Sequence, residues 1–146
     1  MVNKQIKLEL RNISKHFKGV YANKNVNINL YEGEILSILG ENGSGKTTLM
    51  NVLSGIYTPE EGEIYINSKL AHIHSPKDAF EYGIGMVHQH FKLVETFSAI
   101  ENIILGLKEK VSLKEALDKA SGIAEKYGFK IDLKKKIHNM SVSEKQ

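Results

Sequence analysis

Apolar and polar residues alternate along three stretches of the chain. Residues 6–11 read Ile-Lys-Leu-Glu-Leu-Arg, residues 25–30 read Asn-Val-Asn-Ile-Asn-Leu, and Ile64 and Ile66 flank Tyr65 in the same way. A period of two places the apolar side chains on one face of a strand. Because a turn at Lys18-Gly19 separates the first two stretches, the pattern predicts half-buried strands in an antiparallel sheet.

Two other stretches are apolar without alternation. Residues 35–39 read Ile-Leu-Ser-Ile-Leu, which is typical of a buried parallel strand. Residues 84–87 read Ile-Gly-Met-Val and are bounded by glycine, so we interpret them as a further strand. The end of that strand presents residues 88–90, which read His-Gln-His.

Helical spacing replaces alternation in the remaining segments. Apolar residues 49, 52 and 53 recur on one face, and those between residues 113 and 127 form a longer apolar face. Serine N-caps predict four helix starts, three of them with Glu three positions later as in a capping box. The N-caps are Ser75, Ser98, Ser112 and Ser141, and the predicted helix ends are Gly55, Gly83, Gly106 and Gly128.

The helix that begins after Ser141 has room for at most one turn before Gln146. An isolated turn is unstable because nucleation fixes several dihedral angles for one hydrogen bond. We therefore expect this end to fray and to be the start of a longer helix.

The segment from Gly40 to Thr47 fits the phosphate-binding pattern G-x-x-x-x-G-K-[ST] at every fixed position. It lies between a predicted strand and a predicted helix, which is the context that the chemistry requires. Its three glycines permit positive φ values and close approach of a ligand. Backbone N–H groups of residues 42–48 are expected to point into one concavity, and the helix N-terminus adds partial positive charge.

Lys46 is expected to reach the β- and γ-phosphates of a nucleoside triphosphate, and the Thr47 hydroxyl to bind Mg²⁺. The alternative is a chance glycine-rich turn, which the flanking elements disfavour. The candidate nucleotide-binding residues in this loop are Gly40, Glu41, Asn42, Gly43, Ser44, Gly45, Lys46, Thr47 and Thr48.

Composition limits the class of protein and its partners but indicates no further binding or catalytic site. The chain has 146 residues, 41% of them hydrophobic and 25% charged, which is ordinary for a soluble globular protein. A formal net charge of +3 is too small to indicate nucleic acid or an anionic membrane as partner. The absence of Cys fits a reducing compartment, and we expect a cytoplasmic protein.

The order and spacing of several segments resemble the ATP-binding subunits of ABC transporters, in particular those of simple-sugar and nucleoside importers. The segments that carry the resemblance are residues 13–20 (Ile-Ser-Lys-His-Phe-Lys-Gly-Val), 32–35, the loop itself, 53–59, 83–91 and 101–106. They span nearly the whole chain but match only about the first half of such a domain.

The resemblance implies a fold and a division of the chain. It implies an α/β fold, with a P-loop NTPase core, an antiparallel β subdomain and a partial helical subdomain. Residues 1–90 would form the β subdomain and P-loop core, 91–140 the helical subdomain, and 141–146 a truncated signature helix.

The resemblance also implies roles for residues outside the loop. Phe17 takes the place of the aromatic residue that stacks on adenine, with a core phenylalanine as the alternative. Gln89 takes the Q-loop position, where its amide senses Mg²⁺ and the γ-phosphate. Residues 141–144 match the signature segment, so Ser141 and Ser143 would contact ATP held by the opposite subunit. Ser143 replaces the usual Gly, and Met140 replaces the usual Leu.

By resemblance the intact protein hydrolyses ATP with Mg²⁺, in a head-to-tail dimer of nucleotide-binding domains. Its further partners are transmembrane permease subunits, which hold it on the inner face of the cell membrane; no nucleic-acid partner is expected. No apolar strand ending in Asp-Glu follows the signature segment in this sequence. We therefore expect the 146 residues to bind ATP and to hydrolyse it negligibly.

Other interpretations stay open. A non-transport ABC ATPase acting on nucleic acid or ribosomes and a small kinase with the same loop are the alternatives. The pairs His72/His74 and His88/His90 have the spacing of strand-borne metal ligands, but surface histidines are the simpler interpretation. The Lys run at 134–136 indicates a solvated face.

Overall fold

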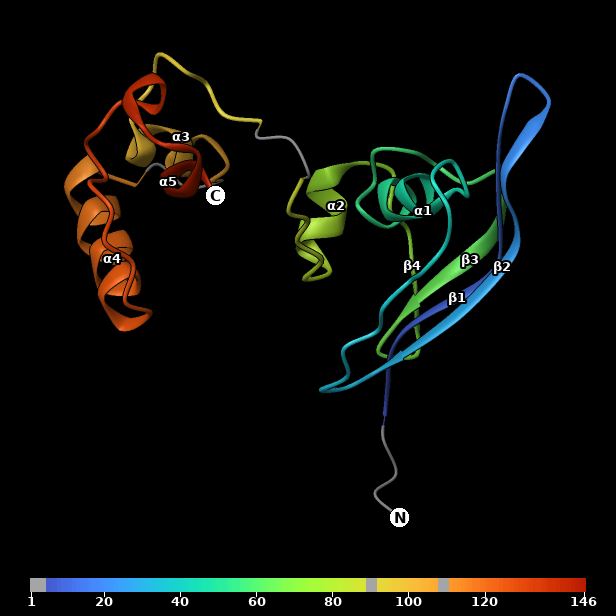
Figure 1. Cartoon of the computed structure of the whole chain (residues 1–146). Helices are drawn as coiled ribbons and strands as arrows, with labels where there is room; N and C mark the ends of the chain where they lie inside the picture. The colour runs from blue at the N-terminus through green and yellow to red at the C-terminus, as the bar shows by residue number, and fades with distance from the viewer. Residues whose placement is uncertain (1–4, 89–91, 108–110) are drawn as a thin grey trace. The chain divides into compact units, whose positions relative to one another are not determined.

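The computed structural model describes residues 5–88, 92–107 and 111–146 (Figure 1). The chain divides into two compact units, Met1–Met86 and Val87–Gln146. Each unit has its own buried cluster. No helix in the described ranges is both long and apolar enough to cross a bilayer.

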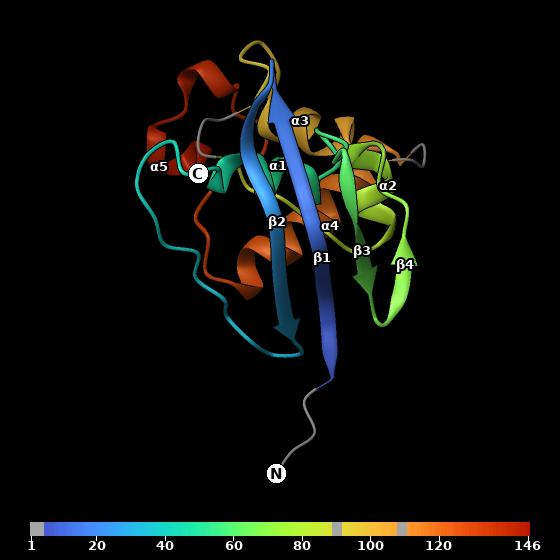
Figure 2. The same ribbon diagram turned by 90° about the vertical axis from the view of Figure 1, so that its right-hand side faces the viewer.

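An antiparallel sheet forms the first unit's frame. Its strands are β1 (Ile6–Phe17), β2 (Val20–Tyr31), β3 (Glu61–Ile66) and β4 (Lys69–Ala71), in the order β2-β1-β3-β4 (Figure 2). The predicted turn at Lys18-Gly19 joins β1 to β2, with φ values of 46° and 83°. The three alternating stretches are therefore strands, as predicted.

β1 and β2 are longer than their alternation indicates. The pairing of β1 with β2 shifts register three times between Leu10 and His16. Each shift marks a β-bulge or irregularity, and an extra residue inverts the alternation of faces. The second half of β1 is thus a strand that the hydropathy pattern could not show.

The first core lies between this sheet and helix α1 (Lys46–Leu53), with α2 (Pro76–Glu81) beside it. The predicted boundaries hold, since Gly55 follows α1 with φ 74° and Gly83 follows α2 with φ 80°. Nearly all members of the core come from the predicted inner faces and the segment after β4. They are Leu10, Ile13, Leu49, Val52, Ile64, Ile66, Ala71, Ile73 and Ala79.

The two predicted apolar strands are wrong. Residues 35–40 and 84–88 contain no strand, and Ile35, Leu39 and Val87 are 95%, 90% and 93% exposed. A parallel strand needs neighbours on its hydrogen-bonding edges, and every strand pair among the described residues is antiparallel. Without those neighbours the segments do not acquire a ladder or a buried face.

The second unit is helical. It contains α3 (Ala99–Leu105), α4 (Leu113–Lys126), the short 3₁₀ helix η1 (Ile137–Asn139) and α5 (Val142–Lys145). The backbone N–H of Ile100 donates to the Leu133 carbonyl at 2.9 Å, which ties α3 to the segment before η1. Its buried cluster is Ala99, Ile100, Ala116, Leu133, Ile137 and Met140.

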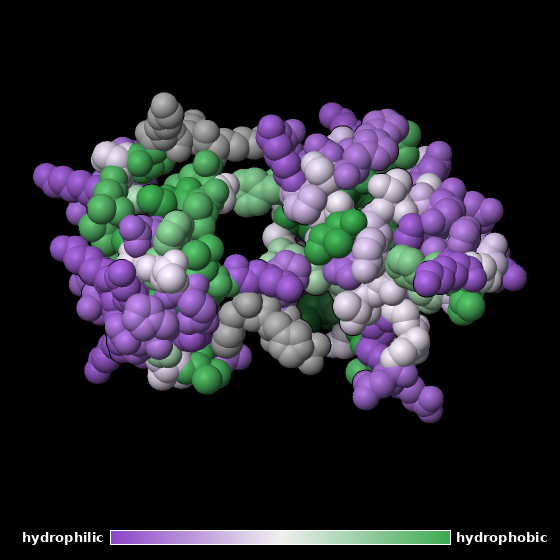
Figure 3. Space-filling model, turned by 90° about the horizontal axis from the view of Figure 1, so that it is seen from above, coloured by the Kyte–Doolittle hydropathy of each residue, from purple (hydrophilic) through white to green (hydrophobic). Residues whose placement is uncertain are grey.

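The predicted apolar face of α4 is only partly buried. Ala116 is buried, whereas Leu113, Ile123 and Tyr127 are 51%, 58% and 64% exposed. Figure 3 shows apolar side chains gathered on the surface of this unit, at the left of the view. The face that the spacing predicts exists, but the described residues cover only its middle.

Candidate nucleotide-binding site

The glycines of the 40–48 segment serve two different purposes. Gly43 and Gly45 have φ values of 85° and 89°, which L side chains adopt only at a cost. Gly40 has no positive φ, contrary to the prediction, but a Cβ there would lie 2.7 Å from Ser44 Oγ. Gly43 and Gly45 thus shape the turn, and Gly40 allows the loop to close on itself.

The N-terminus of α1 is open to a ligand. Among the described α-helices, α2, α3, α4 and α5 each begin with a serine whose side chain accepts from a first-turn N–H. α1 begins instead with Gly45, which supplies no side-chain cap, and its first turn has no acidic residue. First-turn N–H groups have no intrahelical acceptors, so they are free to bind an anion there.

Lys46 lies folded over the loop. Its ammonium group donates to the Gly40 carbonyl at 2.7 Å, the Glu41 carbonyl at 2.6 Å and Ser44 Oγ at 3.2 Å. These contacts match the three donors of an ammonium group. Phosphate oxygens offer stronger, charged acceptors, so the same side chain is placed to exchange the loop carbonyls for a polyphosphate.

The loop rests on β2. Asn23 Nδ2 donates to the Gly45 carbonyl at 3.2 Å, and a Cβ on Gly45 would lie 2.1 Å from the Ala22 carbonyl oxygen. Asn23 is 8% exposed, and its Oδ1 is buried with no partner within the described residues. Thr47 is exposed on the first turn of α1.

Phe17 ends β1 and is 43% exposed. Its ring packs edge-on against Tyr57, with centroids 5.2 Å apart and planes at 70°. Lys15 is paired in register with Asn23, the residue that holds Gly45, so Phe17 lies two positions, about 7 Å, farther along the strand. Phe17 is thus a partly exposed ring near the loop, and it is absent from the buried cluster.

The segment with Ser141 and Ser143 belongs to the second unit. Ser141 and Glu144 form a capping box, because Glu144 N donates to Ser141 Oγ at 3.3 Å and Ser141 N donates to Glu144 Oε2 at 2.7 Å. Lys135 Nζ lies 2.9 Å from Glu144 Oε1. The Lys135 ammonium, followed by the Ser141 N–H, lowers the pKa of Glu144 to about 2. Contacts of the side chains hold the single turn that we expected to fray.

Two predicted features outside the loop are the Q-loop residue and the histidine pairs. Gln89, like His90, lies outside the described residues, so the Q-loop prediction has no geometry here. His72 and His74 stack with centroids 6.4 Å apart, but no cluster of three His, Cys, Asp or Glu in the described ranges could hold a metal ion.

Sequence spacing does not identify three residues that contact the loop or the end of β1 at Phe17. Asn23, Tyr57 and Glu60 contact residues 22 to 45 positions away in sequence, so no local spacing links them. No pattern in the sequence distinguishes Asn23, and Glu60 belongs to a Thr-Pro-Glu-Glu-Gly stretch that indicates only a turn. A pairing of β1 with β2 and β3 is needed before their proximity can be inferred.

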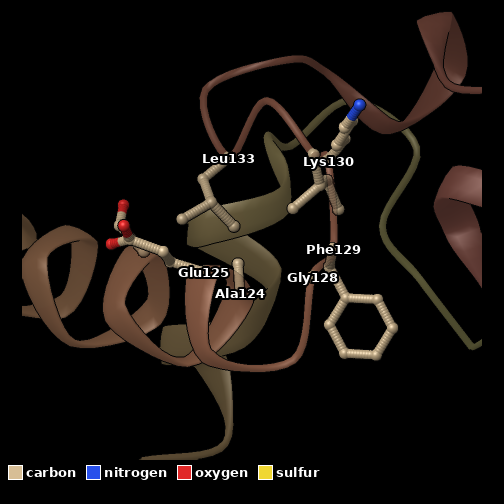
Figure 4. Close-up of a pocket in the computed structure, with 8 residues that line it drawn as sticks. Ala124, Glu125, Gly128, Phe129, Lys130 and Leu133 are labelled. Atoms are coloured by element: carbon tan, nitrogen blue, oxygen red, sulfur yellow. The ribbon is translucent and has the colours of Figure 1, made fainter.

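A separate pocket of about 460 Å³ lies in the second unit, beside the end of α4 (Figure 4). Ala124 and Leu133 contribute apolar walls, and Glu125 and Lys130 contribute charges. None of the predicted nucleotide-binding residues lines it. The loop at the N-terminus of α1 is therefore the candidate site.

The family model described as "ABC transporter" matches residues 23–146, which include the loop and the segment around Ser141. The chain belongs to the ABC transporter family. Among solved structures, the ADP conformation of the ATP-binding cassette MJ1267 superimposes with a TM-score of 0.80 at 27% identity. That match covers 96% of this chain and 61% of the cassette, so the fold is that of an ABC ATPase cassette with its P-loop NTPase core.

Two curated relatives of this ABC protein are named import ATP-binding proteins. It is 48% identical over 143 residues to the guanosine import ATP-binding protein NupO of Bacillus subtilis, covering 95% of this chain and 28% of NupO. It is 43% identical over 150 residues to the nucleoside import ATP-binding protein NupA of Lactococcus lactis, covering 100% of this chain and 29% of NupA. The chain thus spans less than a third of the length of these relatives.

Proposed function

We propose that this chain is the ATP-binding part of an ABC importer subunit for nucleosides or simple sugars. The open N-terminus of α1 carries the proposal, because α1 is the one α-helix among the described residues whose first-turn N–H groups lack a serine cap. The names of NupO and NupA support nucleosides as the imported solute. ATP binding and hydrolysis in the whole protein would drive import.

The phosphate chain of ATP would lie along residues 40–48. Backbone N–H groups at the start of α1 would bind its oxygens, and Lys46 would release its loop acceptors to neutralise the β- and γ-phosphates. Thr47, with Gln89, would hold Mg²⁺, which supplies positive charge against the phosphate oxygens. Phe17 would stack on adenine.

The second unit would serve the other nucleotide of a head-to-tail dimer. Ser141 and Ser143 lie at the start of α5, and the resemblance directs this segment at ATP held by the opposite subunit. In this chain the Ser141 and Glu144 N–H groups are already bound within the capping box. Contact with a phosphate would therefore use the intervening N–H groups and the Ser143 hydroxyl.

Hydrolysis by the 146 residues alone would be slow. By resemblance, the aspartate that supports Mg²⁺ and the glutamate that acts as base follow the signature segment, and no Asp-Glu pair occurs in this sequence. General-base catalysis accounts for roughly 10²- to 10⁴-fold of a rate. Permease subunits would place the whole protein at the inner face of the cell membrane.

Equilibrium binding of MgATP tests the proposal. We expect saturable binding by the 146-residue chain, lost in Lys46→Ala and kept in Lys69→Ala, which removes an exposed Lys from β4 in the same unit. Phosphate release should stay near the background rate. Binding that survives Lys46→Ala unchanged would overturn the proposed site, and copurification with nucleic acid in place of permease subunits would favour the non-transport alternative.

A further inference from the structure

The Glu60 carboxylate links the turn after α1, residues 57–60, to the end of β1. Glu60 Oε1 lies 2.7 Å from Lys15 Nζ, and Glu60 Oε2 accepts from the His16 N–H at 3.1 Å. Lys15 Nζ also donates to the Thr58 carbonyl at 2.9 Å, and Glu60 N donates to the Ser14 carbonyl at 3.0 Å. The three residues that lead into Phe17 are thus held by residues 58–60.

The same turn holds the Phe17 ring itself. Tyr57 meets Phe17 edge-on at 5.2 Å, and Lys15 Nζ lies over the Phe17 ring, 5.3 Å from its centroid. Edge-to-face pairs and cation–π contacts favour one ring orientation because the ring face is negative and its edge positive. Without these contacts, an exposed ring on a strand end would occupy several rotamers and would lose that freedom when a base stacks on it.

The turn is also fixed to the phosphate loop's helix. Tyr57 N and Ile56 N both donate to the Asn51 carbonyl of α1, at 3.1 and 2.9 Å. One continuous piece of chain therefore carries the helix N-terminus at one end and the support of Phe17 at the other. The N-terminus of α1 and the support of Phe17 are therefore held in place relative to each other before a ligand with a ring and an anionic chain binds to both.

We propose that Tyr57 and Glu60 are positioning residues that preorganise Phe17 for a nucleotide base, and so set the affinity for the base without changing the affinity for the phosphate chain. This inference rests on the proposed ATP site. Tyr57 acts through its ring, so Phe at this position preserves the effect. Glu60 acts through Lys15 and the His16 N–H, which fix the strand end.

The test compares two ligands, MgATP and magnesium tripolyphosphate, on the full chain by titration calorimetry. Tyr57→Leu should weaken ATP binding about 3- to 10-fold, the range of a lost aromatic pair, and Glu60→Ala should weaken it by a similar factor because the strand end that carries Phe17 is released. Both variants should bind tripolyphosphate within about 2-fold of wild type. Tyr57→Phe should bind both ligands as wild type does. The matched controls are Tyr65→Leu, which removes a ring that contacts Arg11, and Glu9→Ala, which breaks the Glu9–Arg11 ion pair.

The outcomes separate this inference from the proposed function. If wild type binds neither ligand, the proposed function fails and the inference fails with it. If wild type binds ATP no more tightly than tripolyphosphate, the phosphate site stands and the base-stacking role of Phe17 is refuted. If the Tyr57→Leu and Glu60→Ala variants lose both ligands in parallel, or if the controls lose ATP as they do, these residues only stabilise the fold.

Discussion

Replacing Gly45 with Ala tests the contact between the loop and β2. Gly45 has a φ of 89°, and an added Cβ would lie 2.1 Å from the Ala22 carbonyl oxygen and 2.7 Å from Asn23 Nδ2. Both neighbours belong to β2, whose backbone cannot move without disturbing the sheet. The substitution therefore forces the start of α1 away from the strand.

The cost has two parts that a second glycine separates. Gly19 has a φ of 83°, and nothing lies within 4 Å of its Cβ position, so Gly19→Ala carries only the backbone cost of about 1–2 kcal/mol. Gly45→Ala carries that cost and an overpacking cost of about 1–3 kcal/mol. The expected loss of unfolding free energy is about 1–2 kcal/mol at Gly19 and about 2–5 kcal/mol at Gly45.

Urea unfolding of the two variants measures this difference, and tripolyphosphate titration measures the site. We expect Gly45→Ala to lower the unfolding midpoint further than Gly19→Ala and to abolish anion binding, which Gly19→Ala should retain. Equal unfolding free energies for the two variants would show that Gly45 does not pack on β2. Tripolyphosphate binding by a folded Gly45→Ala protein would show that this packing does not shape the site.

Four further substitutions test contacts that stabilise each unit. Asn23→Ala should lower the unfolding free energy by about 1 kcal/mol in a denaturant titration, through the hydrogen bond lost to the loop. Ser98→Ala removes the buried cap of α3 and should cost about 1–2 kcal/mol, more than Ser112→Ala at an exposed cap, as helical CD against urea would show; equal losses would contradict this. The Lys135 ammonium, followed by the Ser141 N–H, lowers the pKa of Glu144 from 4.5 to about 2, so the stabilisation from these contacts is complete above pH 4.5 and is lost as the pH falls toward 2. Glu144→Gln should remove that pH dependence, and an unchanged acid profile would refute the assignment.

Local signals were sufficient where one short segment determines its own structure. Gly43, Gly45 and Lys46 identified the loop, and the serine N-caps placed the starts of α2, α3, α4 and α5. These features depend on side chains within a few positions of the backbone groups that they satisfy. The predicted capping box at Ser112 is a partial exception. Ser112 caps α4 as predicted, but the Glu115 carboxylate pairs with Lys119 at 3.2 Å.

Features that depend on distant partners were not predictable in the same way. Residues 35–39 have the composition of a buried strand, yet without parallel neighbours Ile35 and Leu39 stay exposed. Bulges concealed the second half of β1, and the support of Phe17 by Tyr57 and Glu60 arises only when β1 meets the turn after α1. Tertiary pairing, which periodicity does not encode, decided each of these cases.

In the proposed complex, the N–H groups at the start of α1 bind the phosphates of ATP. A ¹H–¹⁵N correlation spectrum of the ¹⁵N-labelled chain, titrated with MgATP, tests it residue by residue. We expect the largest amide shifts at Gly43, Gly45, Lys46 and Thr47, and none at the serine-capped start of α4. Saturable shifts centred on another segment, with the amides of residues 43–47 unmoved, would contradict it.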